Sequence, residues 1–343
     1  MSENPVFASK NIPVINCLRG IAATMVCFFH FIDTKGYIDN ADIKSIFRIG
    51  HSGVYIFFVI SGVVIPLSMI RGGYRYRNWG NFMLKRLIRL EPPYLVCIVL
   101  TLIYFQLRVF VPTATDINLT PKTTDIFLHL GYLIPFYHGQ WVLEVFWTLA
   151  VEFQYYLVLS LLLPVALTGN KIYRYCFYLI LLSIPFLLPN KEFFPLHAPL
   201  FLMGILYTFL QMNIIESREC FLLTLLCIAV SVMVSPVIHV IAGLATILII
   251  HFLPNLTTPV LEFLGKISYS LYLLHLITGK ALINVLSHKF SAGYQITIII
   301  IIGYLFSVLS AWVFYKIIEN PAQRWSGRIK YNRIFITIKK QDI

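Results

Sequence analysis

Charged side chains are scarce in this sequence. Asp, Glu, Lys and Arg make up 12% of the 343 residues, whereas hydrophobic residues make up 58%. This polar fraction is too small to cover the surface of a water-soluble globule of this length. A soluble globular protein is therefore excluded, and a membrane protein is expected.

Two further features are missing. The chain has no series of short segments in which polar and apolar residues alternate, as the strands of a membrane barrel require. It also has no linker rich in Pro, Gly or Ser and no internal repeat. We therefore expect one all-α domain over residues 1–343.

Long apolar runs are present instead. Each extends over about 20 residues, and a helix of that length crosses roughly 30 Å of hydrocarbon. The sequence predicts a polytopic membrane protein with about ten transmembrane helices between residues 14 and 318, followed by a basic tail over 319–343. The runs lie near residues 14–32, 51–70, 92–110, 146–167, 173–189, 195–212, 219–235, 237–253, 266–287 and 295–318.

Cysteine patterns that indicate a metal site or a disulfide framework are also absent. The six cysteines form no C-x-x-C pair and have no histidine at ligand spacing. All six lie in or beside predicted helices, so we expect them to be small core residues, and we expect no metal site.

The net charge of +12 does not indicate a nucleic-acid partner, because the basic residues follow the predicted topology. If the ten runs cross the membrane alternately, one side receives eighteen Lys and Arg residues and the other receives seven. The richer side is cytoplasmic by the positive-inside rule. Both termini are therefore predicted to be cytoplasmic.

The first apolar run contains two polar side chains, Arg19 and His30. They are 11 residues apart, which brings them within about 20° of the same helix face and separates them by about 16 Å along the axis. A lone His in such a run is often a packing residue. A buried guanidinium, however, costs about 2.5 to 3.5 kcal/mol on insertion scales and needs a polar environment. The pattern predicts an internal cavity along this helix.

A carboxylate lies in the fourth run, in "WTLAVEFQYY". Glu152, Tyr155 and Tyr156 share one helix face, and Glu152 lies in the same outer half of the membrane as His30. Glu152 can therefore meet and orient His30. The alternative is that Glu152 only neutralises Arg19 or another buried base.

Two arginines precede the third run. Arg86 and Arg89 are three residues apart and point the same way, and Pro92 and Pro93 are expected to break the helix just beyond them. Paired guanidiniums suit phosphate recognition. The alternative is ordinary anchoring of positive charge on the cytoplasmic side.

Two weaker signals remain. Ser61 and Gly62 lie in the second run, where small residues allow close helix packing. Ser268, Tyr272 and His275 lie near one face of the ninth run. His275 is either catalytic or a polar residue that secures a helix contact.

Taken together, these stretches resemble the acyltransferase-3 family of bacterial integral-membrane O-acyltransferases. The resemblance extends from about residue 10 to residue 325, with six motifs in the order and spacing of the family. They are the Arg19 and His30 pair, "FFVISG" at 57–62, Arg86-x-x-Arg89 followed by two prolines, "WTLAVEFQYY" at 147–156, "LGKISYSLYLLH" at 264–275 and "IENP" at 318–321.

The resemblance implies a multi-pass protein of the bacterial inner membrane that uses cytoplasmic acyl-coenzyme A, acetyl-coenzyme A by default. The acceptor is expected to be a hydroxyl of a cell-surface polysaccharide, such as O-antigen or exopolysaccharide, or its lipid-linked precursor. Some relatives carry a periplasmic esterase-like domain after the last helix, and no such domain is expected here.

The resemblance also implies site residues: His30 is expected to be catalytic, and Arg19, Arg86 and Arg89 are expected to support it or bind the donor. The sequence pattern adds Glu152 to the catalytic group, as the carboxylate that orients His30. A neutral imidazole suits general-base chemistry near neutral pH, although an acyl-His30 intermediate also fits. Supporting roles are expected for Trp147, Tyr155, Tyr156, Ser61, Tyr272 and His275.

The main alternative is a transporter of a lipid-linked sugar or small anion, since intramembrane Arg, His and Glu also mark transport pathways. A transporter of this kind usually shows internal repeats with interrupted helices, and none is seen in this sequence. The same enzyme class acting on succinyl-coenzyme A is a second alternative.

Overall fold

A computed structural model describes residues 12–32, 41–108, 121–290 and 293–331. Every regular element in these ranges is helical, which confirms the predicted all-α fold. The long helices are α2 (Pro13–Ile32), α4 (Gly53–Arg71), α5 (Trp79–Arg108), α8 (Trp147–Ala166), α9 (Lys171–Leu187), α10 (Phe194–Gln211), α11 (Ser217–Val234), α12 (Val237–Phe252) and α16 (Gly293–Phe314).

Shorter elements complete the described chain. The α-helices are α3 (Ala41–Arg48), α6 (Thr123–His129), α7 (Ile134–Tyr137), α13 (Pro259–Lys266), α14 (Ser268–Leu274), α15 (Ala281–Ser287) and α17 (Asn320–Arg328). Single 3₁₀ turns lie at Ile49–Ser52, Tyr76–Asn78 and Glu144–Phe146, and π-helical turns lie at Leu276–Lys280 and Tyr315–Glu319.

In the described ranges, eight helices are long and apolar enough to span a bilayer, and each coincides with a predicted run. The other two predicted runs form shorter helices, α9 with 17 residues and α12 with 16. Proline explains the length of α12, because Pro236 precedes it and Pro254 follows it closely. All ten predicted runs are therefore helical in the described residues, but only eight of them form helices of full membrane-spanning length.

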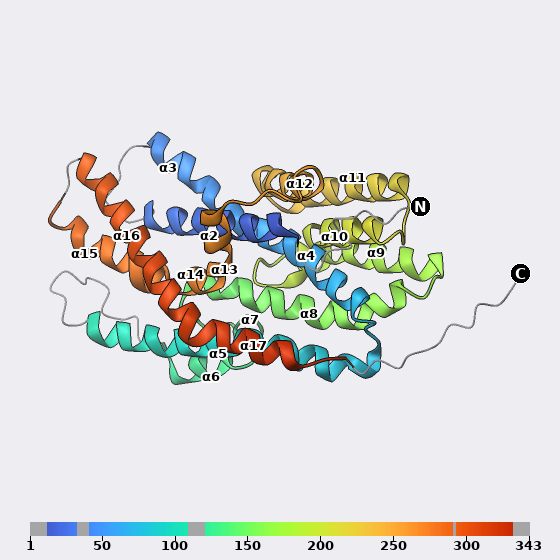
Figure 1. Ribbon diagram of the computed structural model, residues 1–343, viewed down its shortest axis with the longest axis horizontal. Helices are drawn as coiled ribbons and strands as arrows, with labels where there is room; N and C mark the ends of the chain where they lie inside the picture. The colour runs from blue at the N-terminus through green and yellow to red at the C-terminus, as the bar shows by residue number, and fades with distance from the viewer. Residues whose placement is uncertain (1–11, 33–40, 109–120, 291–292, 332–343) are drawn as a thin grey trace, which may run out of the picture.

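The long helices run roughly side by side along the long axis of the molecule (Figure 1). α4 packs against α2, α10 and α12. α13 and α14, which are far from α2 in the sequence, also pack against α2. α16 and α17 form an almost continuous rod, and α17 packs against α5. This arrangement brings residues near 20, 60, 86, 150 and 270 to a common interior.

Glycine permits the closest of these helix contacts. A side chain at Gly62 would overlap the carbonyl oxygen of Phe201 on α10, and one at Gly265 would overlap that of Asn16 on α2. Removing Cβ lets the two backbones approach closely, as the small residues of the second run predicted. The first contact holds α4 against α10, and the second holds α13 against α2.

Proline does not end α5, contrary to the sequence-based expectation. Pro92 and Pro93 lie inside a helix that continues from Trp79 to Arg108. Membrane-embedded helices tolerate proline where neighbouring groups satisfy the backbone locally. Arg86 and Arg89 are therefore part of the same rod as the membrane-spanning residues that follow them.

Five of the six cysteines are buried, as expected, but Cys176 is exposed. It lies on α9, where the neighbouring Tyr173 and Tyr175 are exposed as well. The prediction of a core position was wrong for this cysteine, because the apolar run alone did not show which face of the helix is covered.

Candidate functional site

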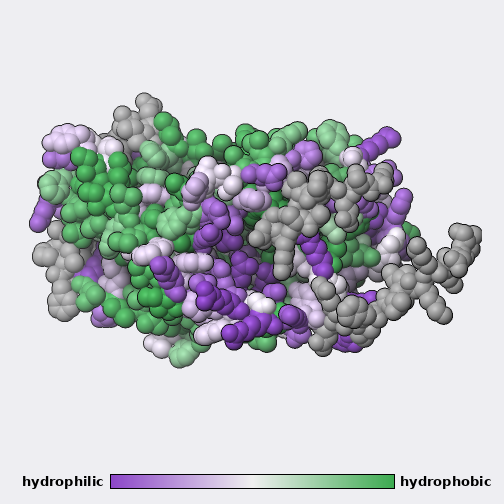
Figure 2. All heavy atoms as spheres, viewed as in Figure 1, coloured by the Kyte–Doolittle hydropathy of each residue, from purple (hydrophilic) through white to green (hydrophobic). Residues whose placement is uncertain are grey.

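A cavity of about 1070 Å³ lies inside the bundle. Its walls come from α2, α4, α5, α8, α14 and α17, together with residues that follow α17. The volume is at the upper end of the roughly 300–1,000 Å³ that is typical of small-molecule sites. Hydrophilic side chains gather across the middle of the face shown in Figure 2, between larger hydrophobic areas.

The cavity is strongly basic. Among the described residues, two acidic side chains, Glu152 and Glu319, line it beside six basic ones, which are Arg19, Arg71, Lys85, Arg86, Arg89 and Lys330. Tyr331 lies beside Lys330; its phenol is neutral at pH 7, and burial raises its pKa further, so it adds no negative charge. A ligand with several negative charges is therefore favoured here.

Arg86 and Arg89 both line this cavity, as their spacing predicted. Arg86 is 4% exposed, and its guanidinium lies over the rings of Phe82 and Tyr156 at 5.4 and 5.5 Å. Aromatic packing on the flat faces leaves the N–H groups at the edge for a ligand. The Nε of Arg86 is buried without a hydrogen-bond partner in the described part of the chain.

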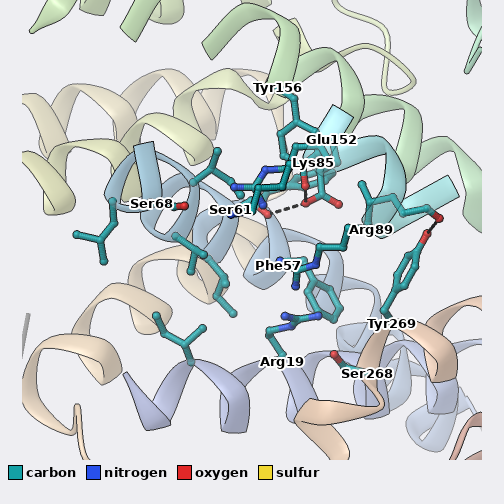
Figure 3. Close-up of a pocket in the computed structure, with 18 of the residues that line it drawn as sticks. Arg19, Phe57, Ser61, Ser68, Lys85, Arg89, Glu152, Tyr156, Ser268 and Tyr269 are labelled. Atoms are coloured by element: carbon teal, nitrogen blue, oxygen red, sulfur yellow. Dashed lines mark hydrogen bonds between the residues drawn. The ribbon is translucent and has the colours of Figure 1, made fainter. Parts of the chain in front are cut away.

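Arg19 enters the same space from α2. Figure 3 shows Arg19 and Arg89 reaching into the cavity, with Glu152 and Tyr156 on the side opposite Arg19. The charged groups that act on Arg19 are Arg89, Glu319 and Glu152. The polar environment that Arg19 requires is thus present.

Glu152 does not meet His30, and that prediction was wrong. Its Oε1 accepts hydrogen bonds from Ser61 at 3.1 Å and from Tyr156. Glu152 also lies within electrostatic range of Arg86 and Arg19. The alternative interpretation, a carboxylate that neutralises buried bases, is the one that the geometry supports.

His30 is paired with Glu144 instead. Its Nδ1 lies 3.2 Å from Oε1 of Glu144, which belongs to the 3₁₀ turn directly before α8. The His30 side chain is 10% exposed and that of Glu144 is 66% exposed. Because a carboxylate accepts the Nδ1–H, Nε2 of a neutral His30 is left to take a proton.

Glu144 was missed because it precedes the fourth apolar run and has no helical phase relation to His30. Its position was the available signal. Glu144 lies at the outer end of the fourth run, and His30 was expected in the outer half of the membrane as well. The scarcity of acidic residues, 15 in the whole chain, makes each one near a membrane span worth considering.

His275 is the second imidazole of this region. Its ring centroid is 5.2 Å from that of His30, and its Nδ1 lies 2.7 Å from the carbonyl oxygen of Tyr272. The hydroxyl of Tyr272 contacts Thr148 Oγ1 at 2.7 Å and donates to Val145 O at 3.0 Å. Tyr272 and Thr148 line the cavity, so this pair lies between the cavity and the two histidines.

The cavity covers only the first part of α2. Its lining on that helix ends at Arg19 and does not include His30. The expectation of one cavity along the whole helix was therefore wrong: Arg19 belongs to the basic cavity, and His30 belongs to a separate cluster with His275 and Glu144.

The supporting residues divide in the same way. Ser61, Tyr156 and Tyr272 line the cavity, whereas Trp147 and Tyr155 do not appear in its lining. Trp147 packs against the rings of Phe58 and His197 at 6.3 and 5.6 Å. Tyr155 stacks on Phe201 at 4.2 Å, so both of these aromatics support the walls.

Glu319 was not predicted as a site residue. It is 1% exposed, and its Oε2 accepts hydrogen bonds from the backbone N–H and the hydroxyl of Ser270. Gln323 donates to its Oε1 at 2.7 Å. The π-turn that ends at Glu319 thus links α16 to α14 and presents a carboxylate to the basic cavity.

Comparison with known proteins gives one positive result. A family model described as an acyltransferase domain matches residues 12–316. The match includes His30, Glu144, His275 and most of the basic cavity, and it ends just before Glu319. Searches of curated proteins and of solved structures found no match.

Proposed function

The chain belongs to the acyltransferase-3 family, and from this we propose that it moves an acyl group, acetyl by default, from acyl-coenzyme A to a polysaccharide hydroxyl. The enzyme is a multi-pass membrane acyltransferase. The proposal adds the donor, the acceptor outside the membrane, and a location in the bacterial inner membrane.

The observation that carries the proposal is the charge of the cavity. Six basic side chains against two acidic ones favour a polyanionic ligand, and the nucleotide end of coenzyme A carries several phosphate charges. Arg86 and Arg89 supply the planar, paired donors that suit phosphate oxygens. Lys85 and Lys330, at the basic mouth, support entry from the cytoplasmic side under the positive-inside rule.

The inner end of the cavity supports the chemistry. The narrow pantetheine arm would extend from Arg86 toward Tyr272 and Thr148. The thioester would then lie close to the cluster of His30, His275 and Glu144. Arg19 lies within the cavity wall, so its proposed role is to position the donor rather than to contact the acceptor.

His30 is the proposed general base. The carboxylate of Glu144 accepts a hydrogen bond from Nδ1–H of His30, so Nε2 of His30 can take the proton of the acceptor hydroxyl. The hydroxyl oxygen then attacks the thioester carbonyl, the C–S bond breaks, and coenzyme A leaves as its thiol once a proton reaches the sulfur. A cell-surface polysaccharide or its lipid-linked precursor is the proposed acceptor.

The test measures label transfer from radiolabelled acetyl-coenzyme A to surface polysaccharide in membranes with equal amounts of each variant. His30→Ala should abolish transfer while binding acetyl-coenzyme A normally. Arg86→Lys should weaken donor binding by about 10-fold or more, because it loses charge-assisted hydrogen bonds worth roughly 1.5–3 kcal/mol each. Arg77→Lys, at an exposed position outside the cavity lining, is the matched control.

Undiminished transfer by His30→Ala would exclude His30 as the essential base. Transfer from succinyl-coenzyme A but not from acetyl-coenzyme A would keep the mechanism and change the acyl group. An absence of transfer from both donors with the wild type would contradict the proposed function.

A further inference from the structure

His275 has one nitrogen that nothing in the described part of the chain explains. The side chain is fully buried, with 0% exposure. Its Nδ1 contacts the carbonyl oxygen of Tyr272 at 2.7 Å, and its Nε2 is buried without a hydrogen-bond partner. Because a carbonyl oxygen only accepts, Nδ1 carries the proton, and Nε2 of the neutral ring presents an unshared electron pair.

An unpaired ring nitrogen alone does not mark a functional histidine, because Nδ1 of the buried His197 also has no hydrogen-bond partner in the described part of the chain. His275 differs from His197 in that its ring lies beside a second imidazole, that of His30. The backbone around His275 is also irregular. A π-turn begins directly after it, and its carbonyl oxygen accepts from Lys280 N at 3.0 Å. Such turns frequently occur at functional sites.

His275 lies between the two halves of the site. Its ring centroid is 5.2 Å from that of His30 and 6.0 Å from that of Tyr272. Tyr272 lines the basic cavity, whereas His30 contacts Glu144 on the other side. In the described residues, the charged groups close to His30 and His275 are Glu144 and Lys280.

The proposed reaction needs a proton to cross this region. The acceptor hydroxyl loses a proton on the side of His30, and the coenzyme A sulfur must gain one on the side of the cavity. One imidazole at His30 would have to serve both positions. Two adjacent imidazoles can instead hold the proton in turn.

We propose that His275 is the proton-relay partner of His30: it receives at Nε2 the proton that His30 removes from the acceptor and passes it toward the departing sulfur, on the side of Tyr272 and Thr148. The acceptor O–H bond breaks as its proton moves to Nε2 of His30. The new O–C bond forms and the C–S bond breaks. The proton passes to Nε2 of His275 and then to the thiolate, which restores both neutral rings. This relay rests on the proposed function.

The experiment compares two acyl donors in each variant. Acetyl-coenzyme A releases a thiol that needs protonation, whereas S-(4-nitrophenyl) thioacetate releases a far more acidic thiol that leaves without it. His275→Gln should lose at least about 100-fold in rate with acetyl-coenzyme A and remain within about threefold of the wild type with the nitrophenyl thioester. His30→Gln should lose activity with both donors.

His197→Gln is the matched control. His197 is also buried, with Nε2 paired to Lys191 O at 2.8 Å and Nδ1 without a partner, but it packs against Trp147 and Phe58 rather than His30. It should show the same small change with both donors. The ratio of the two rates within one variant does not depend on the amount of folded protein, so a loss of stability does not obscure the result.

Equal losses with both donors in His275→Gln and His275→Asn would overturn the relay and assign His275 a structural role. Unchanged rates with both donors would overturn it as well. A wild type that transfers from neither donor would overturn the proposed function, and the relay with it.

Discussion

Two glutamates near the start of one helix belong to different sites. Glu144 lies before α8, is largely exposed and pairs with His30. Glu152 lies about one and a half turns into α8, lines the basic cavity and accepts hydrogen bonds from Ser61 and Tyr156. Their eight-residue separation corresponds to about 12 Å along a helix, enough to place one beside His30, the proposed base, and the other in the cavity proposed for the donor.

Glu144→Gln should lower kcat by roughly 10²-fold, because the amide no longer stabilises the positive charge that develops on His30 as it takes a proton. The KM for acetyl-coenzyme A should stay nearly constant, since Glu144 is absent from the cavity lining. Steady-state rates measured against both substrates in purified membranes test this.

The control for Glu144 is Glu152→Gln. It removes a negative charge from the basic cavity, the proposed donor site, while retaining a hydrogen-bond acceptor for Ser61, so its main effect should be on the KM for acetyl-coenzyme A. If instead Glu152→Gln reduced kcat and Glu144→Gln left it unchanged, the assignment of the two glutamates would be reversed.

At the scale of helices, the sequence was sufficient for most of the fold. Runs of about 20 apolar residues predict spans because a helix of that length matches the bilayer. The spacing of Arg86 and Arg89 likewise predicted one shared face, since i and i+3 are neighbours on a helix.

The remaining features depend on contacts between distant segments. The continuation of α5 through Pro92 and Pro93 requires neighbours that accommodate the missing N–H donors. The π-turn after His275 leaves no mark in the apolar pattern, because hydrophobicity does not record which carbonyl each N–H contacts. The pairing of His30 with Glu144 follows from tertiary packing over 114 residues of sequence.

Helix packing at glycine gives a direct test at this scale. Gly62→Ala should destabilise the protein by about 1–3 kcal/mol, because the added Cβ meets the backbone of α10 at Phe201 and Gly204, which cannot move as a side chain can. Thermal unfolding in detergent should therefore shift to a lower temperature.

Gly80→Ala provides the opposite case. Gly80 lies near the start of α5, and no atom of the described residues lies within 4 Å of the position of an added Cβ. Alanine there should stabilise the helix by roughly 0.5–1 kcal/mol. Equal stability changes in both variants would show that the α4–α10 contact is not as tight as described.

The whole molecule separates two chemical environments along its length. The basic cavity lies toward Arg71, Lys85 and Lys330, and the cluster of His30, His275 and Glu144 lies past Tyr272 and Thr148. In the proposed reaction the donor reaches the histidines from one side of the membrane and the acceptor from the other. Exposed apolar side chains on helices such as α11 surround this interior and suit contact with lipid.

This separation requires that the two ends of the bundle face opposite sides of the membrane, which cysteine labelling can measure. The Cys176→Ser background removes the exposed cysteine, while the other five are buried. Single cysteines are then introduced at Arg77, between α4 and α5, and at Asn190, between α9 and α10; both positions are exposed. A membrane-impermeant maleimide should label the Asn190→Cys variant in spheroplasts and the Arg77→Cys variant only in inverted vesicles, because the positive-inside rule places the basic end in the cytoplasm. Labelling of both variants from the same side would contradict the topology, and labelling in the reverse order would place the basic cavity mouth outside, where cytoplasmic acyl-coenzyme A could not reach it.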